Sequence, residues 1–163
     1  MTTPSLRGDG TPEDVWWGPG GLAGIPGRDP AVARPSGRAV VVAPHPDDEV
    51  LGLGGARAVW APHGVEVLVV GVTDGEASHP GSPTLDPEAL VTRRDDERRT
   101  ALVALGLGGT AVHRLGLPDG GVAADDVAAG LAGVLRAGDT VIVPVDGDGH
   151  PDHDATAVGG GRA

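Results

Sequence analysis

Two short segments rich in histidine and aspartate hold the residues of this 163-residue chain that are best suited to chemistry. The first, HPDDE, runs from His45 to Glu49, and the second, DGDGHPDHD, runs from Asp146 to Asp154. Two imidazoles and one carboxylate form a three-ligand site for zinc that leaves a position for water. A further carboxylate can accept a proton from that water, and a further histidine can stabilise an oxyanion. Together the segments contain a residue type for each step of metal-assisted amide hydrolysis.

Other interpretations of these two segments stay open at this point. Acidic, glycine-rich loops at strand ends are often only solvated, and one HPDD string by itself does not separate a loop from a site. Two such strings, each directly after a buried strand, favour a site. Two histidines with one carboxylate also suit non-haem iron, so the ligand types alone do not choose the metal.

Strand-like and helix-like segments alternate along the chain after Gly37. The predicted strands cover residues 39–43, 65–73, 111–115 and 140–145, and the predicted helices cover residues 49–61, 88–105 and 122–137. This alternation predicts an α/β fold, namely a Rossmann-like three-layer αβα sandwich whose mainly parallel sheet has an order starting 3-2-1-4. Ligands of such sheets bind at the carboxyl ends of the strands beside the switch point. The two His/Asp segments follow the first and fourth strands, so topology and chemistry indicate the same place.

The two ends of the chain differ in amino-acid composition from the middle. Residues 1–37 contain 8 Gly and 6 Pro, which predicts an irregular N-terminal arm before a domain over 38–163. We expect Trp16 and Trp17 to pin this arm to the domain through their large apolar area. Near the other end, residues 154–158 could begin a helix that the glycines at 159–161 then break.

The predicted helix over 88–105 presents a stripe that is apolar at both ends and charged in the middle. The stripe comprises Leu90, Arg94, Glu97, Ala101 and Leu105. Arg94 and Glu97 are therefore expected on the inward side, either at the site or paired with each other. Three further arginines off this stripe are expected to form a solvated face: Arg93, Arg98 and Arg99.

Composition excludes several classes of protein. The formal net charge of −11 argues against nucleic acid or an anionic membrane as partner. The absence of cysteine excludes a disulfide scaffold and a thiolate metal site. The first residues lack a signal-peptide pattern, and no apolar stretch is long enough to span a membrane, so a cytoplasmic protein is expected.

Five separated motifs, in order along the chain, resemble those of the PIG-L or LmbE-like superfamily of metal-dependent N-deacetylases. They are APHPDDE at 43–49 followed by LG and GG, TDGE at 73–76, the spacing of Arg94, Glu97, Ala101 and Leu105-Gly106, LPDG at 117–120, and HPDH at 150–153. The resemblance covers about residues 38 to 157. It implies a hydrolase that removes an N-acetyl group from an amino sugar such as an N-acetylglucosamine conjugate.

The resemblance also implies roles for individual residues. His45, Asp48 and His153 would be the ligands of Zn²⁺, with Fe²⁺ as another possible metal. Asp47 would be the general base. A second group would act on the substrate: His150 on the acyl oxygen or the leaving amine, Asp152 by orienting His150, and Arg94 by contact with the sugar or its anionic substituent. Asp119 would bind substrate at the rim of the site, although an Asp-Gly pair also favours a turn.

This chain departs from the resemblance in two places. It ends ten residues after His153, where family members continue, so the domain is expected to be incomplete at its C-terminus. Asp148 stands where some members carry an aromatic residue before the second motif. A non-catalytic remnant that binds a metal or a partner without turnover is therefore the alternative to an enzyme.

Overall fold

A four-stranded parallel sheet forms the centre of the chain in a computed structural model that describes residues 12–163. Its strands are β1 (Ala39–Ala43), β2 (Val67–Gly71), β3 (Ala111–Arg114) and β4 (Thr140–Ile142). The strand order is β3-β2-β1-β4, and every neighbouring pair is parallel. The predicted order starting 3-2-1-4 is therefore confirmed, with the switch point between β1 and β4.

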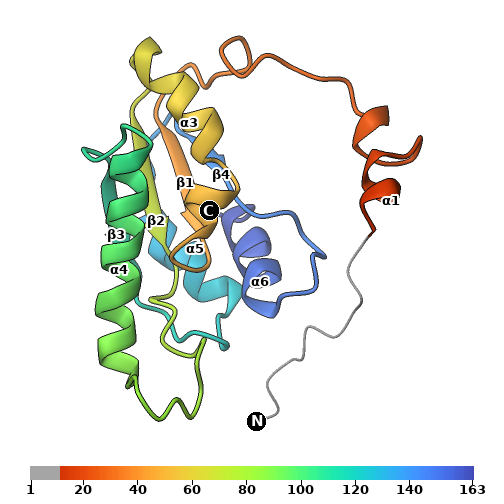
Figure 1. Cartoon of the computed structure of the whole chain (residues 1–163). Coiled ribbons are helices and arrows are strands. Elements are labelled where there is room, and N and C mark those ends of the chain that lie inside the picture. The colour runs from red at the N-terminus through yellow and green to blue at the C-terminus, as the bar shows by residue number, and fades with distance from the viewer. Residues whose placement is uncertain (1–11) are drawn as a thin grey trace.

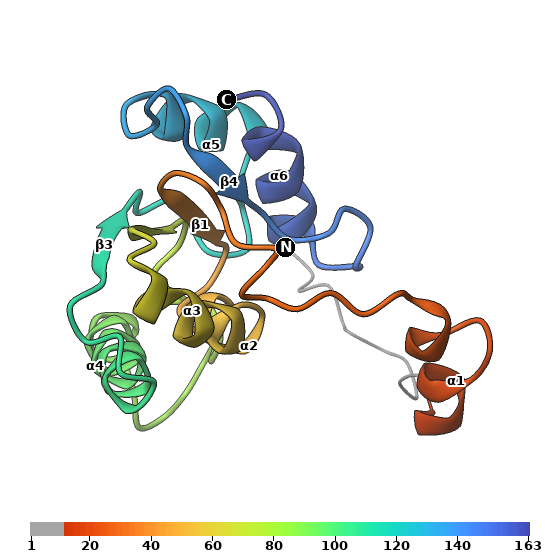
Figure 2. The same ribbon diagram turned by 90° about the horizontal axis from the view of Figure 1, so that it is seen from above.

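Helices cover both faces of this sheet. The covering helices are α2 (Asp48–Leu51), α3 (Gly54–Trp60), α4 (Pro87–Ala104), α5 (Ala124–Ala132) and α6 (Pro151–Gly160). The chain also has α1 (Glu13–Trp17) and the 3-10 turns η1 (Leu22–Gly24) and η2 (Ala61–His63). Seen from above in Figure 2, α2, α3 and α4 lie on one side of the sheet, and α5 and α6 lie together on the other. This is the predicted three-layer αβα arrangement (Figure 1). No helix within residues 12–163 is long and apolar enough to cross a membrane.

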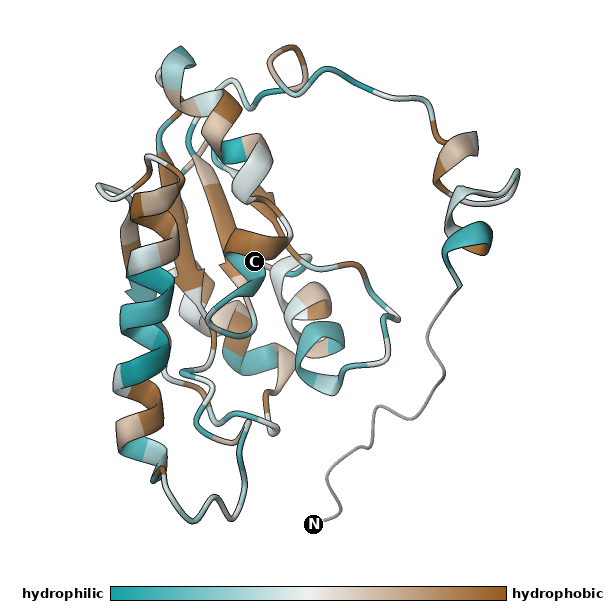
Figure 3. Cartoon of the chain, in the orientation of Figure 1, coloured by the Kyte–Doolittle hydropathy of each residue, from teal (hydrophilic) through white to brown (hydrophobic). Residues whose placement is uncertain are grey.

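The core is built mainly from valine. All five residues of β1 are buried, as expected for a parallel strand covered on both faces. Val40 and Val42 point to the α5 side, where they pack with Val127 and Leu131. Figure 3 shows the strands as the most hydrophobic part of the chain. Burial of each such side chain stabilises the fold by about 1.5–3 kcal/mol.

Two predicted helix boundaries were wrong, and closely packed glycines lie at both places. The predicted helix over 49–61 is divided into α2 and α3, and Gly54 at the start of α3 lies so close to α4 that an added Cβ would be 2.9 Å from Leu105 Cδ1. α6 begins at Pro151 and continues through Gly159 and Gly160, which the sequence predicted to break it. A Cβ on Gly159 would lie 2.7 Å from Val127 Cβ, so these glycines let α6 approach α5 and β4.

The tryptophans of the arm do not pin it to the domain. Trp16 and Trp17 are 50% and 62% exposed, and α1 stands away from the sheet in Figures 1 and 2. Instead, the buried Trp60 of α3 donates its indole N–H to the carbonyl oxygen of Pro30 at 2.9 Å. Residues 1–11 of the predicted arm lie outside the described residues.

An ion pair ties the start of β1 to the turn before β4. Arg38 donates from Nε to Asp139 Oδ1 at 3.0 Å and from Nη2 to Oδ2 at 2.6 Å. Arg38 also donates to the carbonyl oxygen of Val134 at the end of the α5 segment. This pair lies at the opposite end of the strands from the His/Asp segments, so it serves the fold.

Candidate metal centre and active site

The segment after β1 is held by hydrogen bonds that continue the β1–β2 pairing. Thr73 donates from its backbone N–H and from Oγ1 to the carbonyl oxygen of Pro44, at 3.0 and 2.8 Å. The next residues turn sharply, and Asp48 Oδ2 accepts the backbone N–H of His45 at 3.0 Å. His45 and Asp48 are thereby fixed on one tight turn at the carboxyl end of β1.

The segment after β4 places the second motif on the first turn of α6. His150 is the N-cap residue, and its Nδ1 accepts the backbone N–H of Asp152 at 3.3 Å. His153, three residues further, points toward the turn after β1 and approaches its residues directly. The topology therefore brings together His45 and His153, 108 positions apart in sequence.

The three side chains predicted as metal ligands form a nearly equilateral triangle of donor atoms. His153 Nε2 lies 3.3 Å from His45 Nδ1 and 3.3 Å from Asp48 Oδ2. His45 Nδ1 lies 3.5 Å from Asp48 Oδ2. Ligand atoms placed tetrahedrally at 2.0–2.2 Å from one zinc ion are about 3.3–3.6 Å apart. The donor types and their spacing therefore fit a divalent metal of this size.

A second set of possible ligands consists of His45, His150 and His153, whose ring nitrogens lie within 4.8 Å of one another. The hydrogen bond at the α6 N-terminus argues against it. Because Nδ1 of His150 accepts a backbone N–H, the neutral ring carries its proton on Nε2. A protonated ring nitrogen has no free lone pair for a metal, so His150 is better suited to donate a hydrogen bond.

The ring of His45 is also contacted on the side away from the triangle. Its Nε2 lies 3.3 Å from Asp119 Oδ1 and 3.3 Å from Asp152 Oδ2. Burial by itself lowers the pKa of His45. Interactions with Asp119, Asp48 and Asp152 outweigh burial and raise that pKa to about 10. Carboxylates thus surround this imidazole, which creates a strongly negative environment that suits a cation.

The Asp152 carboxylate is buried and anchored by the loop after β3. Its side chain is 1% exposed and accepts the backbone N–H groups of Gly120 and Val122, at 2.7 and 3.1 Å. Its backbone N–H, not its carboxylate, hydrogen-bonds His150, so orientation of His150 by Asp152 stays a prediction. The carboxylate instead ties the loop after β3 to the ring of His45.

Asp119, predicted to bind substrate at the rim of the site, lies behind His45. Its side chain is 8% exposed, and Oδ2 accepts the backbone N–H of Ala77 at 2.8 Å. Burial raises the pKa of the Asp119 carboxyl, but the hydrogen bonds from His45 and the backbone N–H of Ala77, together with the charges of His45 and Arg94, leave that pKa below its ordinary value. Contact with a substrate stays a prediction for this residue.

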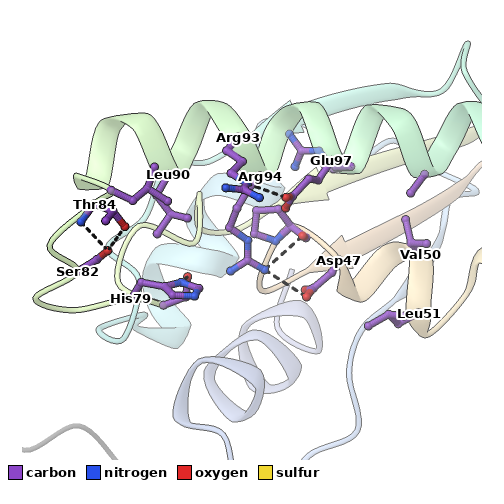
Figure 4. Close-up of a pocket in the computed structure, with 15 residues that line it drawn as sticks. Asp47, Val50, Leu51, His79, Ser82, Thr84, Leu90, Arg93, Arg94 and Glu97 are labelled. Carbon is purple, nitrogen blue, oxygen red and sulfur yellow. Dashed lines mark hydrogen bonds and ion pairs between the residues drawn. The ribbon is translucent and has the colours of Figure 1, made fainter.

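A cavity of about 860 Å³ opens beside the turn after β1. Asp47 and Arg94 lie on its wall, and Arg94 Nη2 is 3.2 Å from Asp47 Oδ2 (Figure 4). Arg94 also donates to the carbonyl oxygen of Pro46 at 3.3 Å. Gly75 permits this approach, because its φ is +74° and an added Cβ would lie 2.7 Å from Arg94 Nη1. Asp47 is half-exposed on this wall, whereas none of the three triangle residues lines this cavity.

The other charges of α4 are arranged differently from the prediction. Glu97 is exposed and pairs with Arg93 at 3.0 Å, so neither its inward position nor its pairing with Arg94 is confirmed. Arg98, predicted to be solvated, is 4% exposed and pairs with Asp95. Arg93 and Arg99 are exposed as predicted.

Asp148 is the residue near the site to which the sequence assigned no role. Its Oδ2 lies 2.6 Å from Nδ1 of His153, and its Oδ1 accepts the backbone N–H of His150 at 2.9 Å. The one available signal was its place between two glycines: Gly147 and Gly149 have φ of +84° and +94°. These left-handed conformations fold the loop so that Asp148 reaches back to α6.

Two curated proteins are similar to this chain, and both are named as deacetylases of 1D-myo-inositol 2-acetamido-2-deoxy-alpha-D-glucopyranoside. The protein from Kineococcus radiotolerans is 34% identical over 149 aligned positions, which cover 71% of this chain and 41% of the relative. The protein from Catenulispora acidiphila is 33% identical over 158 positions, which cover 79% and 47%. The chain therefore spans less than half the length of these relatives.

Solved structures share the fold. N,N'-diacetylchitobiose deacetylase from Pyrococcus horikoshii has a TM-score of 0.65 and 30% identity, over 73% of this chain and 46% of that one. A conserved protein from Thermus thermophilus has a TM-score of 0.56 and 34% identity, over 73% and 51%. The 4-carboxy-2-hydroxymuconate hydratase GalB from Pseudomonas putida has a TM-score of 0.62 and 25% identity, over 76% and 54%.

A family profile also matches this chain. The profile described as PIG-L, GlcNAc-PI de-N-acetylase, matches residues 40–163. The matched range includes the HPDDE turn, the LPDG loop and the HPDH turn, which are the segments that build the site. On this match, the chain belongs to the PIG-L family.

Proposed function

We propose that this chain is a metal-dependent N-deacetylase that hydrolyses the acetamide of an N-acetylglucosamine-type sugar. The observation that carries the proposal is the triangle of His45 Nδ1, Asp48 Oδ2 and His153 Nε2, next in sequence to Asp47 on the wall of an open cavity. Membership of the PIG-L family and the printed activities of the deacetylase relatives support the substrate class.

His45, Asp48 and His153 would hold the metal, and we propose zinc. Two imidazoles with one carboxylate are a common catalytic zinc set, although iron(II) uses similar ligands. A divalent metal at such a site supplies Lewis acidity, which polarises the acyl oxygen and makes a water molecule more acidic.

Asp47 is the proposed general base. Its carboxylate lies next in sequence to the ligand Asp48, and it lines the cavity. It accepts a proton as water oxygen forms a bond to the acyl carbon. Arg94 on α4 forms an ion pair with this carboxylate at 3.2 Å, which helps to fix the position of the Asp47 side chain. Positioning of this kind contributes strongly to rate, because small displacements of a catalytic group are costly.

His150 is proposed to act at the acyl oxygen and the leaving nitrogen. The backbone N–H of Asp152 occupies its Nδ1, so a proton on Nε2 is available for donation. A donor at this place stabilises the negative charge that develops on the acyl oxygen. When the C–N bond breaks, the leaving nitrogen takes up a proton, and the products are acetate and a free amino sugar.

The test is acetate release from N-acetylglucosamine and from its glycoside conjugates by the purified chain loaded with one equivalent of Zn²⁺. We expect turnover by the wild type and a loss of about 10²–10⁴-fold for Asp47→Asn, with the metal retained. Asp146→Asn makes the same chemical change on an exposed residue of the loop after β4 and should leave turnover unchanged. Bound zinc without release of acetate from any acylated amino sugar would instead support a non-catalytic, metal-binding role.

A further inference from the structure

Asp148 contacts both histidines of the HPDH motif. It sits in the loop between β4 and α6, and its side chain is 30% exposed. Oδ1 accepts the backbone N–H of His150, which anchors the carboxylate on the first turn of α6. Oδ2 is left facing the ring of His153 at 2.6 Å from Nδ1.

The geometry distinguishes a hydrogen bond from shared coordination of one metal. Two ligands of a tetrahedral metal are about 3.3–3.6 Å apart, so a separation of 2.6 Å is too short for Asp148 and His153 Nδ1 to be such a pair. It is close to the length of a charge-assisted hydrogen bond between an N–H and a carboxylate. Nδ1 of His153 is therefore the donor, and its Nε2 keeps a free lone pair.

That lone pair is the one that the triangle needs. Nε2 is the atom of His153 that lies 3.3 Å from both His45 Nδ1 and Asp48 Oδ2. A carboxylate on the far ring nitrogen of a ligating histidine fixes its tautomer, its ring orientation and its basicity. We propose that Asp148 is a positioning residue that holds His153 in the tautomer and orientation required to bind the metal.

The two ligating histidines differ in how much support they receive. His45 has two carboxylates on its Nε2, Asp119 and Asp152, whose side chains are 8% and 1% exposed. His153 has one, Asp148, in an exposed loop. Loss of Asp148 should therefore affect His153 while leaving the support of His45 intact. This proposal rests on the proposed metal site, but it does not require that the chain be a deacetylase.

The experiment compares zinc affinity, measured by competition with a chromophoric chelator, among the wild type, Asp148→Asn and Asp148→Ala. Asp148→Ala should weaken zinc binding by about 10–100-fold. Asp148→Asn should lose less, because its amide oxygen can still accept the Nδ1 proton. Asp154→Asn is the matched control, since the Asp154 carboxylate accepts the backbone N–H of Gly147 in the same loop. Its affinity should equal that of the wild type.

A second readout reports on the tautomer without metal or turnover. Nitrogen-15 NMR of histidine-labelled, metal-free chain, at a pH where the ring is neutral, should show His153 protonated on Nδ1. In Asp148→Ala the signal should move toward the Nε2-protonated form. Zinc affinity within twofold of the wild type for Asp148→Ala, or an unchanged tautomer, would overturn the proposal. If Asp148→Ala does not fold, the zinc affinity of the near-isosteric Asp148→Asn decides, and it should be lower than that of the wild type. A wild type that binds zinc but releases no acetate refutes only the deacetylase activity, whereas one that binds no zinc overturns both.

Discussion

The structural role of Asp152 can be tested separately from any catalytic role. Its carboxylate accepts two backbone N–H groups, Gly120 at 2.7 Å and Val122 at 3.1 Å, in a place where the side chain is 1% exposed. Each hydrogen bond to a charged group contributes about 1.5–3 kcal/mol. Asp152→Ala leaves both N–H groups without their acceptor, so the free energy of unfolding should fall by about 3–6 kcal/mol.

Asp152→Asn provides a graded form of the same test. Its amide oxygen can accept one N–H, but its NH₂ group then faces the other, so we expect a loss of about half that of alanine. The assay is urea unfolding of metal-free chain followed by far-UV circular dichroism. Asp154→Ala is the control, because the carboxylate of Asp154 accepts a single backbone N–H in an exposed loop. A loss below about 1 kcal/mol for Asp152→Ala would refute the anchoring role.

Three further changes test other parts of the structure. Arg94→Ala should lower kcat/KM by about 10²-fold without loss of metal, because Asp47 loses its partner; steady-state kinetics and metal analysis check this. Gly159→Ala should destabilise the fold by about 1–3 kcal/mol in urea unfolding, because its Cβ would meet α5 at 2.5–2.9 Å. The hydrogen bond from Arg38 holds the pKa of Asp139 below its usual range. The free energy of unfolding should therefore differ most between wild type and Asp139→Asn above about pH 5, and this difference should vanish as acid protonates Asp139 in the folded state. Urea unfolding at several pH values checks this.

The sheet and the meeting of the two His/Asp segments could be predicted because they depend on patterns that are local in sequence. The runs AVVVA and VEVLVVGVT indicate buried parallel strands, and the alternation with helices then restricts the strand order. Once that order is fixed, the carboxyl ends of β1 and β4 must be neighbours. The proximity of His45 to His153 follows from this topology.

Other features depend on contacts between distant segments, which periodicity does not encode. Arg98 is buried because Asp95 pairs with it one turn earlier on α4 and the sheet lies beneath it. Gly159 and Gly160 stay helical because their missing side chains make room for α5 and β4. Trp16 and Trp17 remain exposed, and in the described part of the arm it is Pro30 that meets the domain, by accepting the indole N–H of Trp60.

The partners of the carboxylates around the site also depend on contacts between distant segments. Sequence places Asp148 and Asp152 near the histidines but cannot say which ring nitrogen each one faces. Asp152 faces His45 rather than His150, because the loop after β3 supplies the N–H groups that orient it. Asp148 faces His153 because two left-handed glycines turn its loop.

The most direct test of the account is the metal content of single-site variants of the proposed ligands. Purified wild type dialysed against limiting Zn²⁺ should retain one ion per chain. Asp48→Ala and His153→Ala should lose that ion, whereas His150→Ala should keep it, because the proton on Nε2 of His150 makes that ring a donor. Retention by Asp48→Ala together with loss by His150→Ala would show that the three histidines hold the metal, and would contradict the triangle of His45, Asp48 and His153.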